Sequence, residues 1–222
     1  MALKNNIGIL SWTYNDPAVW YEFVIDTAKL AKKNGIISLF KSAYYLTEEA
    51  VKNVIDACDV FAISIKAIDE KYYKEFTTGT LPPVLNAAKL VYNSGKHLEI
   101  SNLVVTGLTN NEESYKKMIS FIKDELDEKV PLHFTRFHPD YKYTEVKKTP
   151  LEDVKHAVKI AKNKGLQHVY VGNVFADDNI NTYCKHCGAL LVRRYGLTAT
   201  IQDNLNKDGS CAKCGISNDF EM

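Results

Sequence analysis

The sequence lacks a charge excess of either sign and lacks any long hydrophobic run. Its 222 residues carry 28 Lys+Arg against 27 Asp+Glu, a formal net charge of +1. Dedicated nucleic-acid binders usually carry a basic surplus, so we expect no nucleic-acid partner. No segment approaches the ~20 apolar residues of a membrane span, and the first residues lack the apolar stretch of a secretion signal. We therefore expect a cytoplasmic protein without membrane association.

Motifs that cradle nucleotide phosphates are also missing. No strand-like segment is followed by G-x-G-x-x-G or a P-loop, which argues against nucleotide binding through those loops. The composition is that of a folded globular protein, with 45% hydrophobic and 25% charged residues. A chain of this length can bury a core without disulfides, and it fits one domain of ordinary size with a small appendage.

Residues 1–173 alternate between β-rich runs and amphipathic helical patterns. The expected strands are 7–13, 36–40, 60–66, 98–105, 132–137 and 168–172. Strands that alternate with helices through short loops predict parallel βαβ units. Polar residues inside the strand runs, such as Glu99, Ser101 and His133, favour a partial (β/α) barrel over a doubly wound sheet, because a barrel mouth needs polar groups.

Polar residues gather where the expected strands end. In parallel α/β barrels, functional residues lie on the loops that leave the carboxyl ends of the strands. The candidate binding residues on these loops are Tyr14, Asn15, Asp16, Ser42, Ser64, Lys66, Arg136 and His138. This set of polar and charged loop residues suits a polar anionic or zwitterionic ligand. Each residue also has a purely structural explanation; Asp16, for example, is a good N-cap for a helix that begins at Pro17.

The alternation of helix and strand patterns stops after residue 173. This change predicts a second, smaller module over residues 174–222. This module contains two C-x-x-C pairs, formed by Cys184, Cys187, Cys211 and Cys214. The two-residue spacing turns both thiolates of a pair toward one ion, and four thiolates favour Zn²⁺, with iron in a rubredoxin-like site as the alternative. Four protein ligands leave no open position, so we expect a structural metal site. The remaining Cys58 is expected to be a small buried side chain.

Four segments together resemble one enzyme family. They are WTYNDPAVW at 12–20, LHFTRFHPDYK at 132–142, VYVGN at 169–173 and NTYCKHCGALL at 181–191. In order along essentially the whole chain, they are similar to the radical SAM enzymes of AmmeMemoRadiSam systems, relatives of the pyruvate formate-lyase activating enzyme. The resemblance implies a partial (β/α) barrel that binds S-adenosylmethionine and a [4Fe-4S] cluster, with a cysteine-rich C-terminal module.

The resemblance gives roles to several strand-end residues. Tyr14, Asn15 and Asp16 fall where the family has Tyr-Asn-Glu, in the region that meets the methionine end of S-adenosylmethionine. Arg136 and His138 match the family's motif as they stand.

Other strand-end positions depart from the family pattern. Lys66 falls on the lysine of an Asp-Leu-Lys motif, but Ser64 replaces its aspartate. Ser42 and Ala43 stand where the family usually has Asn-Gly. These departures fall at positions that the resemblance assigns to S-adenosylmethionine.

The largest departure concerns the cluster ligands. The family holds its cluster with a C-x-x-x-C-x-x-C triad on the loop after its first strand, and these 222 residues contain no such triad. By this resemblance, Met1–Asn6 aligns with the end of the helix that precedes the family's Tyr-Asn-Glu-Pro strand, so the family's first βα unit is absent from these residues. The expected fold is therefore α/β, a partial (β/α) barrel lacking its first βα unit over 1–173, with a zinc-ribbon or rubredoxin-like module over 174–222. Without three thiolates the [4Fe-4S] cluster has no protein anchors here.

Three functions remain open. The first is a degenerate or truncated radical SAM-like protein that keeps a residual S-adenosylmethionine-type pocket and a structural metal ribbon, but performs no radical chemistry alone. The second is one half of a split radical SAM enzyme of the glycyl-radical-activating kind, completed by a partner that carries the cluster cysteines; a strand edge at Ile7–Trp12 would invite that partner. The third is a non-enzymatic scaffold or binding module that acts through the ribbon.

Overall fold

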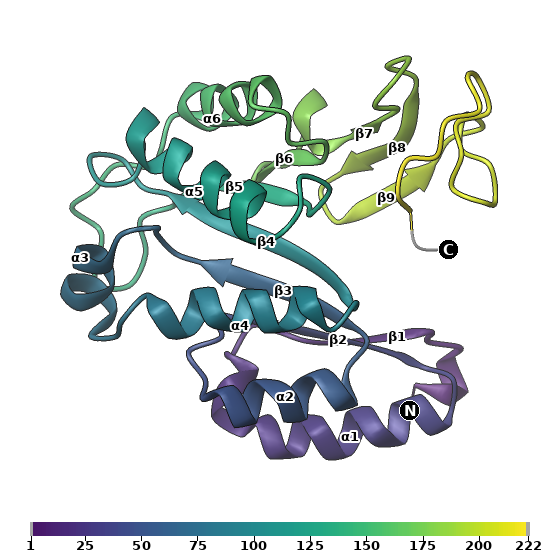
Figure 1. Ribbon diagram of the computed structural model, residues 1–222, viewed down its shortest axis with the longest axis horizontal. Helices are drawn as coiled ribbons and strands as arrows, with labels where there is room; N and C mark the ends of the chain where they lie inside the picture. The colour runs from purple at the N-terminus through teal and green to yellow at the C-terminus, as the bar shows by residue number, and fades with distance from the viewer. Residues whose placement is uncertain (1, 221–222) are drawn as a thin grey trace. The chain divides into compact units, whose positions relative to one another are not determined.

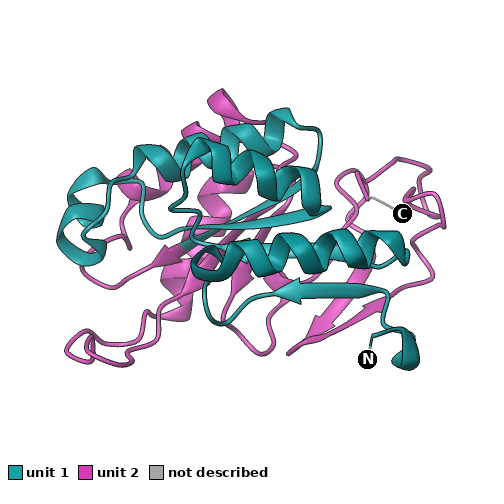
Figure 2. Cartoon of the chain, turned by 90° about the horizontal axis from the view of Figure 1, so that it is seen from below, with its two compact units in different colours: residues 1–102 teal, residues 103–222 magenta. Residues whose placement is uncertain are grey.

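A computed structural model of the chain describes residues 2–220. The chain divides into two compact units, residues 1–102 and 103–222, which Figure 2 shows in different colours. The boundary between these units falls inside a strand. It differs from the predicted boundary at 173/174, which separates the α/β part from the cysteine module and stays a prediction.

The first unit alternates strands with helices, as the sequence predicts. Its strands are β1 (Ile9–Trp12), β2 (Ile37–Ser42), β3 (Val60–Ile65) and β4 (His97–Val104), and its main helices are α1 (Tyr21–Lys33), α2 (Glu48–Ala57) and α4 (Pro82–Asn93). Shorter turns are η1 (Leu3–Asn5), η2 (Pro17–Trp20), α3 (Glu70–Tyr72) and the π-helical η3 (Tyr73–Thr77). The strands pair in parallel from β1 to β4 (Figure 1). The α3–η3 segment was not predicted from the sequence pattern.

Capping residues explain where these helices begin. Asp16 Oδ1 accepts a hydrogen bond from the backbone N–H of Ala18 at 3.0 Å, directly before η2. Thr47 Oγ1 accepts from the N–H of Ala50 at 3.3 Å and caps α2. Both contacts satisfy a donor that the first turn of a helix leaves unpaired, and the Asp16 contact confirms the predicted N-cap.

One face of the first unit's sheet is buried and the other is partly exposed. Along β3, Phe61, Ile63 and Ile65 are buried, whereas the residues between them are partly exposed. The same alternation runs along β4. Because successive side chains of a strand point to opposite faces, the helices cover one face. The opposite face carries small polar side chains such as Ser64 and Ser101.

The second unit contains the rest of the α/β pattern and the cysteine module. Its elements are α5 (Glu112–Glu125), β5 (Leu132–Arg136), α6 (Leu151–Asn163), β6 (Val169–Gly172), η4 (Asp178–Ile180), β7 (Thr182–Tyr183), β8 (Leu190–Tyr195) and β9 (Thr198–Ile201). β5 pairs in parallel with β6, and β7, β8 and β9 form a separate antiparallel sheet. Six parallel strands thus follow the order β1 to β6 in one sheet, which confirms the predicted α/β class with a C-terminal cysteine module.

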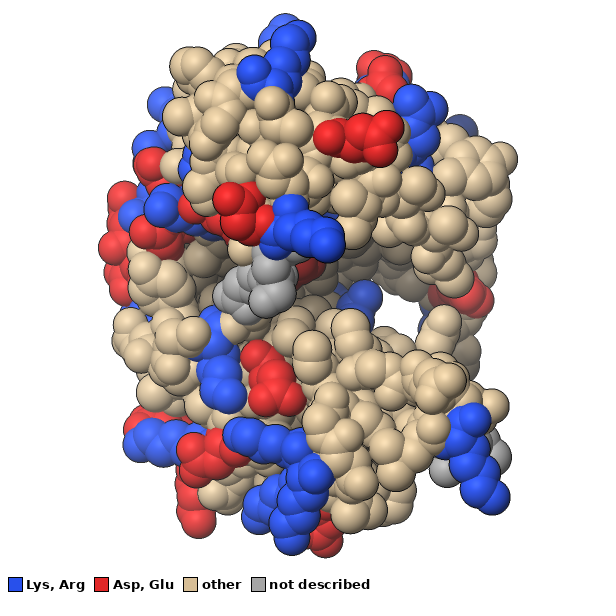
Figure 3. All heavy atoms as spheres, turned by 90° about the vertical axis from the view of Figure 1, so that its right-hand side faces the viewer, with Lys and Arg blue, Asp and Glu red and all other residues tan. Residues whose placement is uncertain are grey.

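Charged side chains do not concentrate by sign on the face shown in Figure 3. Lys and Arg alternate there with Asp and Glu, so this face presents no broad field of one sign. Within residues 2–220, none of the helices combines the length and the apolar character needed to cross a membrane.

The core of the second unit is built around β5. Leu132 and Phe134 are fully buried, and the Phe134 ring meets the ring of Tyr115 from α5 edge to face, with centroids 5.7 Å apart. Such edge-to-face pairs stabilise a core beyond the area that they bury.

A matched pair of leucine variants tests this core. Leu132→Ala should lower the free energy of unfolding by about 2–5 kcal/mol, because it leaves a cavity among packed side chains. Leu197 is fully exposed, so Leu197→Ala should change that free energy by less than about 0.5 kcal/mol. Denaturant titration of the two variants gives the comparison, and equal effects would contradict the placement of Leu132.

Candidate functional site

The Asp16 carboxylate organises the carboxyl ends of β1 and β2. Besides capping η2, it accepts a hydrogen bond from Ser42 Oγ at 2.6 Å and one from the backbone N–H of Ala43 at 2.8 Å. These contacts tie the loop after β1 to the end of β2. An ionised carboxylate offers about four acceptor positions, so three protein donors leave roughly one for a ligand.

Lys66 lies within electrostatic reach of this carboxylate, and Lys41 lies within electrostatic reach of Lys66. Burial lowers the pKa of Lys66, Asp16 opposes that shift, and Lys41 adds to it. Lys66 follows β3, and its backbone N–H donates to the Tyr73 hydroxyl at 3.3 Å. An acid and two cations at one strand edge can hold the ammonium and the carboxylate of a zwitterion such as an amino acid.

Backbone strain gathers at the same edge. Tyr14 and Tyr44, which follow β1 and β2, have φ angles of 71° and 54°. Left-handed conformations of non-glycine residues cost of order 1–3 kcal/mol and are concentrated at ligand sites. Tyr44 is fully buried, and its N–H donates to Ser42 Oγ at 2.9 Å, so the Asp16–Ser42 contact also holds this residue. Asn15 is exposed beside them.

Ser64 stands where the resemblance expects an aspartate. This position therefore carries a hydroxyl group in place of a carboxylate. Its hydroxyl lies 3.1 Å from the hydroxyl of Ser101, across the β3–β4 pair. The two hydroxyls satisfy each other on the partly exposed face of the sheet. This face therefore presents neutral polar groups at the position of Ser64.

Arg136 and His138 belong to the second unit. The Arg136 Nε donates to the carbonyl of Thr149, and Thr149 is fully buried. Thr149 also donates from its N–H to the Phe137 carbonyl at 3.2 Å, so the two ends of the loop 138–148 are held together. Arg136 thereby anchors a loop, and His138 is exposed within it. Thr149 was not predicted, because its partners lie 12 or more residues away and no local pattern marks it.

A hydrogen bond thus joins Asp16 and Ser42 inside the first unit, and Lys66 is linked to Asp16 by electrostatics alone. The assignment of all eight candidate residues to a cofactor stays a prediction.

The four predicted metal ligands come together. The sulfurs of Cys184, Cys187, Cys211 and Cys214 lie within 4.8 Å of one another. The Cys184–Cys214 and Cys187–Cys211 sulfurs are 3.6 and 3.7 Å apart. A disulfide would need about 2.05 Å. Four thiolates about 2.3 Å from one tetrahedral ion lie about 3.8 Å from each other, so the spacing fits a single metal ion.

The two cysteine pairs have the same backbone structure. The N–H of Cys184 donates to the Ala189 carbonyl at 2.8 Å, and the N–H of Cys211 donates to the Ile216 carbonyl at 2.9 Å, five residues on in each case. Gly188 and Gly215, which follow the pairs, have φ angles of 69° and 75°, a conformation that favours glycine.

Backbone hydrogen-bond donors also stabilise the thiolate form of Cys184. Burial opposes ionisation of Cys184, but the backbone N–H groups of Cys187 and His186 donate to its sulfur. Its pKa falls to about 6. A thiolate is the form that binds a metal ion. Buried Leu191 and Val192 pack beside the cysteines and complete an apolar shell.

A [4Fe-4S] cluster does not fit the cysteines of this module. In such a cluster each thiolate binds a different iron, which requires wider sulfur spacing than a single ion. Within residues 2–220, no other group of three or more possible metal ligands is found. The donor set fits either zinc or a single iron.

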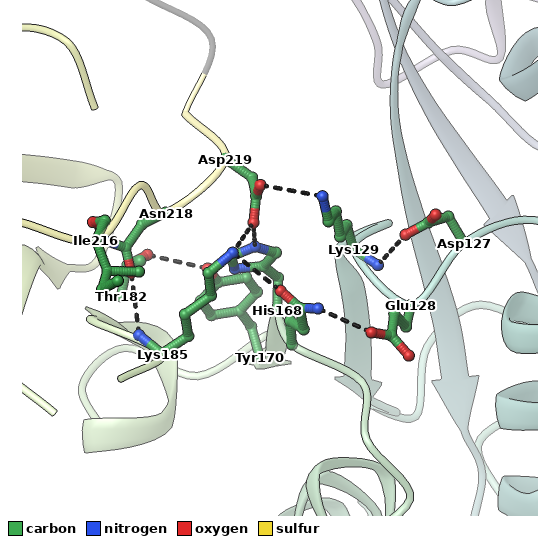
Figure 4. Close-up of polar contacts among 11 residues, drawn as sticks. Asp127, Glu128, Lys129, His168, Tyr170, Thr182, Lys185, Ile216, Asn218 and Asp219 are labelled. Carbon is green, nitrogen blue, oxygen red and sulfur yellow. Dashed lines mark hydrogen bonds and ion pairs between the residues drawn. The ribbon is translucent and has the colours of Figure 1, made fainter. Parts of the chain in front are cut away.

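Asp219 links the cysteine module to the α/β part of the second unit. Its carboxylate lies between Lys185, His168 and Lys129, as Figure 4 shows. Lys185 Nζ is 2.7 Å from Oδ2, His168 Nε2 is 3.4 Å from Oδ2, and Lys129 Nζ is 3.6 Å from Oδ1. Burial opposes ionisation of Asp219, but hydrogen bonds from Lys185 and His168 hold its pKa below the usual value.

A neighbouring asparagine fixes this link to the metal ligands. Buried Asn218 accepts from the backbone N–H of Lys185 at 3.0 Å and donates to the Ile216 carbonyl at 2.8 Å. Lys185 lies inside the first cysteine pair, and Ile216 follows the second. Asn218 therefore spans both pairs, a role that no sequence pattern indicated.

A sequence profile identifies the family. The profile of the Radical SAM superfamily matches residues 1–122, more than half of the chain. The chain belongs to the radical SAM superfamily. The matched residues include the Asp16 network and the strands β1 to β4 that position it, so membership implies S-adenosylmethionine and an iron–sulfur cluster as the family's cofactors.

Curated relatives of the chain are longer than it is. An uncharacterized protein of Methanocaldococcus jannaschii is 39% identical over 216 residues, which cover 97% of this chain and 63% of that protein. The pyruvate formate-lyase-activating enzyme of Clostridium pasteurianum is 29% identical over 154 residues, 64% of this chain and 63% of that enzyme. The chain thus spans less than two thirds of the length of these relatives.

Solved structures share the fold. A domain of a pyruvate-formate lyase-activating enzyme from Bacteroides vulgatus superposes with a TM-score of 0.63 at 19% identity, over 74% of this chain and 98% of that one. Streptococcus suis SuiB bound to S-adenosylmethionine gives a TM-score of 0.64 at 14% identity, over 84% of this chain and 46% of SuiB. At these identities the likeness concerns the fold.

The metal centre can be tested by composition. Purified protein should carry about one zinc or iron per chain, and Cys184→Ser or Cys211→Ser should lose it, because three thiolates no longer complete the tetrahedron. Cys58 is buried and is not one of the four grouped cysteines, so Cys58→Ala should keep the metal. Elemental analysis of the three variants measures this, and metal retained by Cys211→Ser would refute the four-thiolate site.

The Asp219 link can be tested by hydrogen exchange. Asp219→Ala should speed amide exchange around Lys129, His168 and Lys185, because it removes the shared carboxylate. Asp203→Ala replaces an exposed aspartate of the same module and should leave exchange there unchanged. Unaltered exchange in Asp219→Ala would show that the carboxylate does not hold the module.

Proposed function

We propose that this chain binds S-adenosylmethionine at the carboxyl edge of β1 to β3, and that these 222 residues do not cleave it reductively by themselves. Radical SAM superfamily membership supports the ligand. The proposal extends the family assignment to the AmmeMemoRadiSam type, and it places the protein in a reducing, cytoplasmic setting where its cysteines stay available to metal.

The observation that carries the proposal is the Asp16 network. The carboxylate is oriented by three protein donors and keeps acceptor capacity for the ammonium of the methionine moiety. The half-buried Lys66 supplies a cation for the methionine carboxylate. The network is held by strained Tyr44 and buried Ser42, so its donors are ordered before any ligand arrives.

Cleavage needs an electron source that the described residues do not offer. The family's cluster would supply the electron, but the sequence has no C-x-x-x-C-x-x-C triad and the C-terminal thiolates fit a single ion. What this chain's residues would do is bind and orient the sulfonium ligand. The metal module acts as a structural support in this proposal.

Calorimetry tests the binding step. The protein should bind S-adenosylmethionine, and Lys66→Met should weaken binding by roughly tenfold to a hundredfold, because it removes a charged partner of the ligand carboxylate. Lys52, in a surface pair with Glu48, provides the matched control Lys52→Met, which should bind as the wild type does. Absence of binding in the folded wild type would favour the scaffold function.

Product analysis tests the cleavage step separately. Anaerobically reconstituted and reduced protein should form no 5′-deoxyadenosine from S-adenosylmethionine. Formation of this product by the 222-residue chain alone would refute the proposal, even if binding were confirmed.

A second candidate function is supported by one observation, the open edge of β1. β1 is the terminal strand of the parallel sheet among the described residues, and Ile7 and Ile9 are 44% and 56% exposed. An uncharged, exposed strand edge is a template for another strand. We propose as the alternative that a polypeptide carrying the cluster cysteines adds its strand here. Co-purification with such a protein, and 5′-deoxyadenosine formation by the mixture alone, would support this alternative.

A further inference from the structure

The cysteine module has an open edge of its own. In its sheet, β9 is the last strand of the order β7-β8-β9, and all four of its residues are exposed. Its sequence Thr-Ala-Thr-Ile contains no charge and no proline. Natural proteins usually protect open edges with lysine, proline or a bulge. None of these occurs in β9, so the edge is free to pair.

The register of the hairpin shows which backbone groups face outward. Gln202 donates its N–H to the Leu191 carbonyl at 2.9 Å, which marks Leu191 and Gln202 as a hydrogen-bonded pair. Hydrogen-bonded and non-hydrogen-bonded pairs alternate along an antiparallel ladder. Thr200 and Thr198 therefore bond to β8, and the N–H and C=O groups of Ala199 and Ile201 point away from β8.

These outward groups are complementary to a second copy of themselves. When two β9 strands run antiparallel with Thr200 opposite Thr200, Ala199 of each copy lies opposite Ile201 of the other. Both residues carry outward N–H and C=O groups, so each such pair can exchange two hydrogen bonds. The central Thr200 pair is then a non-hydrogen-bonded pair, where side chains are closest and Thr–Thr contacts are favourable.

We propose that a second copy of this chain pairs with the free edge of β9, so that two cysteine modules form one continuous six-stranded antiparallel sheet about a two-fold axis. Such an interface is isologous, because the same strand serves both copies. It brings no like charges opposite one another within β9. A strand of a different protein could use the same backbone groups, but an identical strand also places Thr200 opposite Thr200 and brings no charged residue into the pair.

The neighbouring turn presents this edge in a fixed shape. The N–H of Gly196 donates to the Phe175 carbonyl at 2.7 Å, and the Phe175 and Tyr195 rings meet edge to face at 4.5 Å. Phe175, Tyr195 and Ile201 are 65%, 60% and 66% exposed. Exposed apolar side chains held rigidly beside an open edge are typical of an interaction surface. A partner strand would cover part of this surface at little cost in ordering.

Sedimentation of the metal-loaded protein over a wide concentration range, with a reductant present, tests the proposal. The wild type should approach twice the monomer mass as concentration rises. Ala199→Pro removes an outward N–H that β8 does not use, and it should weaken dimerisation by roughly tenfold or more. Ala199→Val keeps this N–H and should dimerise as the wild type does.

Several outcomes would overturn the proposal. One is a wild type that stays monomeric at every concentration. Another is a dimer that persists unchanged in Ala199→Pro, which would place the interface elsewhere, for example at β1. A third is loss of the dimer in Ala199→Val with full metal content, because the outward backbone donor would then not decide pairing. Metal content and circular dichroism show that each variant has folded.

Discussion

The Asp16 carboxylate is the interaction on which the first unit's candidate site depends. One side chain caps η2, holds the end of β2 through Ser42 and Ala43, and raises the pKa of Lys66 against the effect of burial. A single carboxylate can satisfy these demands because parallel strands bring their carboxyl ends to one edge. The strained backbone at Tyr44 persists because this contact and burial over-determine it.

The second unit depends on a different constraint, the sulfur spacing of the four cysteines. Because the spacing fits one ion, the module has a fixed geometry that carries Lys185, Asn218 and Asp219 into place. The link from Asp219 to His168 and Lys129 then joins the module to the start of β6 and the loop before β5. A metal ion bound by the cysteines would thus be linked, through the contacts of Asn218 and Asp219, to the position of the module against β6 and the loop before β5.

Local signals made most of the fold and the metal ligands predictable. The start of the first helical segment followed from Asp16, because caps act within three residues, and the metal site followed from spacing within each C-x-x-C pair. Long-range partnerships were not predictable. Arg136 carries a family motif, but its contact with Thr149 depends on how a loop closes. Asp219 and His168 are 51 residues apart, so no periodicity connects them.

The open edges of β1 and β9 constrain which polypeptides can pair with this protein. β1 and β9 are both uncharged and terminal in their sheets among the described residues, but β9 is exposed throughout whereas β1 contains buried Trp12. An unprotected edge carries an aggregation cost, which selection tolerates when a specific strand occupies it. The outward groups of β9 match those of an identical strand, whereas a parallel sheet continues at β1 only with a further parallel strand and its crossover. Our two proposals therefore give the edges different occupants, a second copy of the chain at β9 and, in the alternative function, a polypeptide with the cluster cysteines at β1.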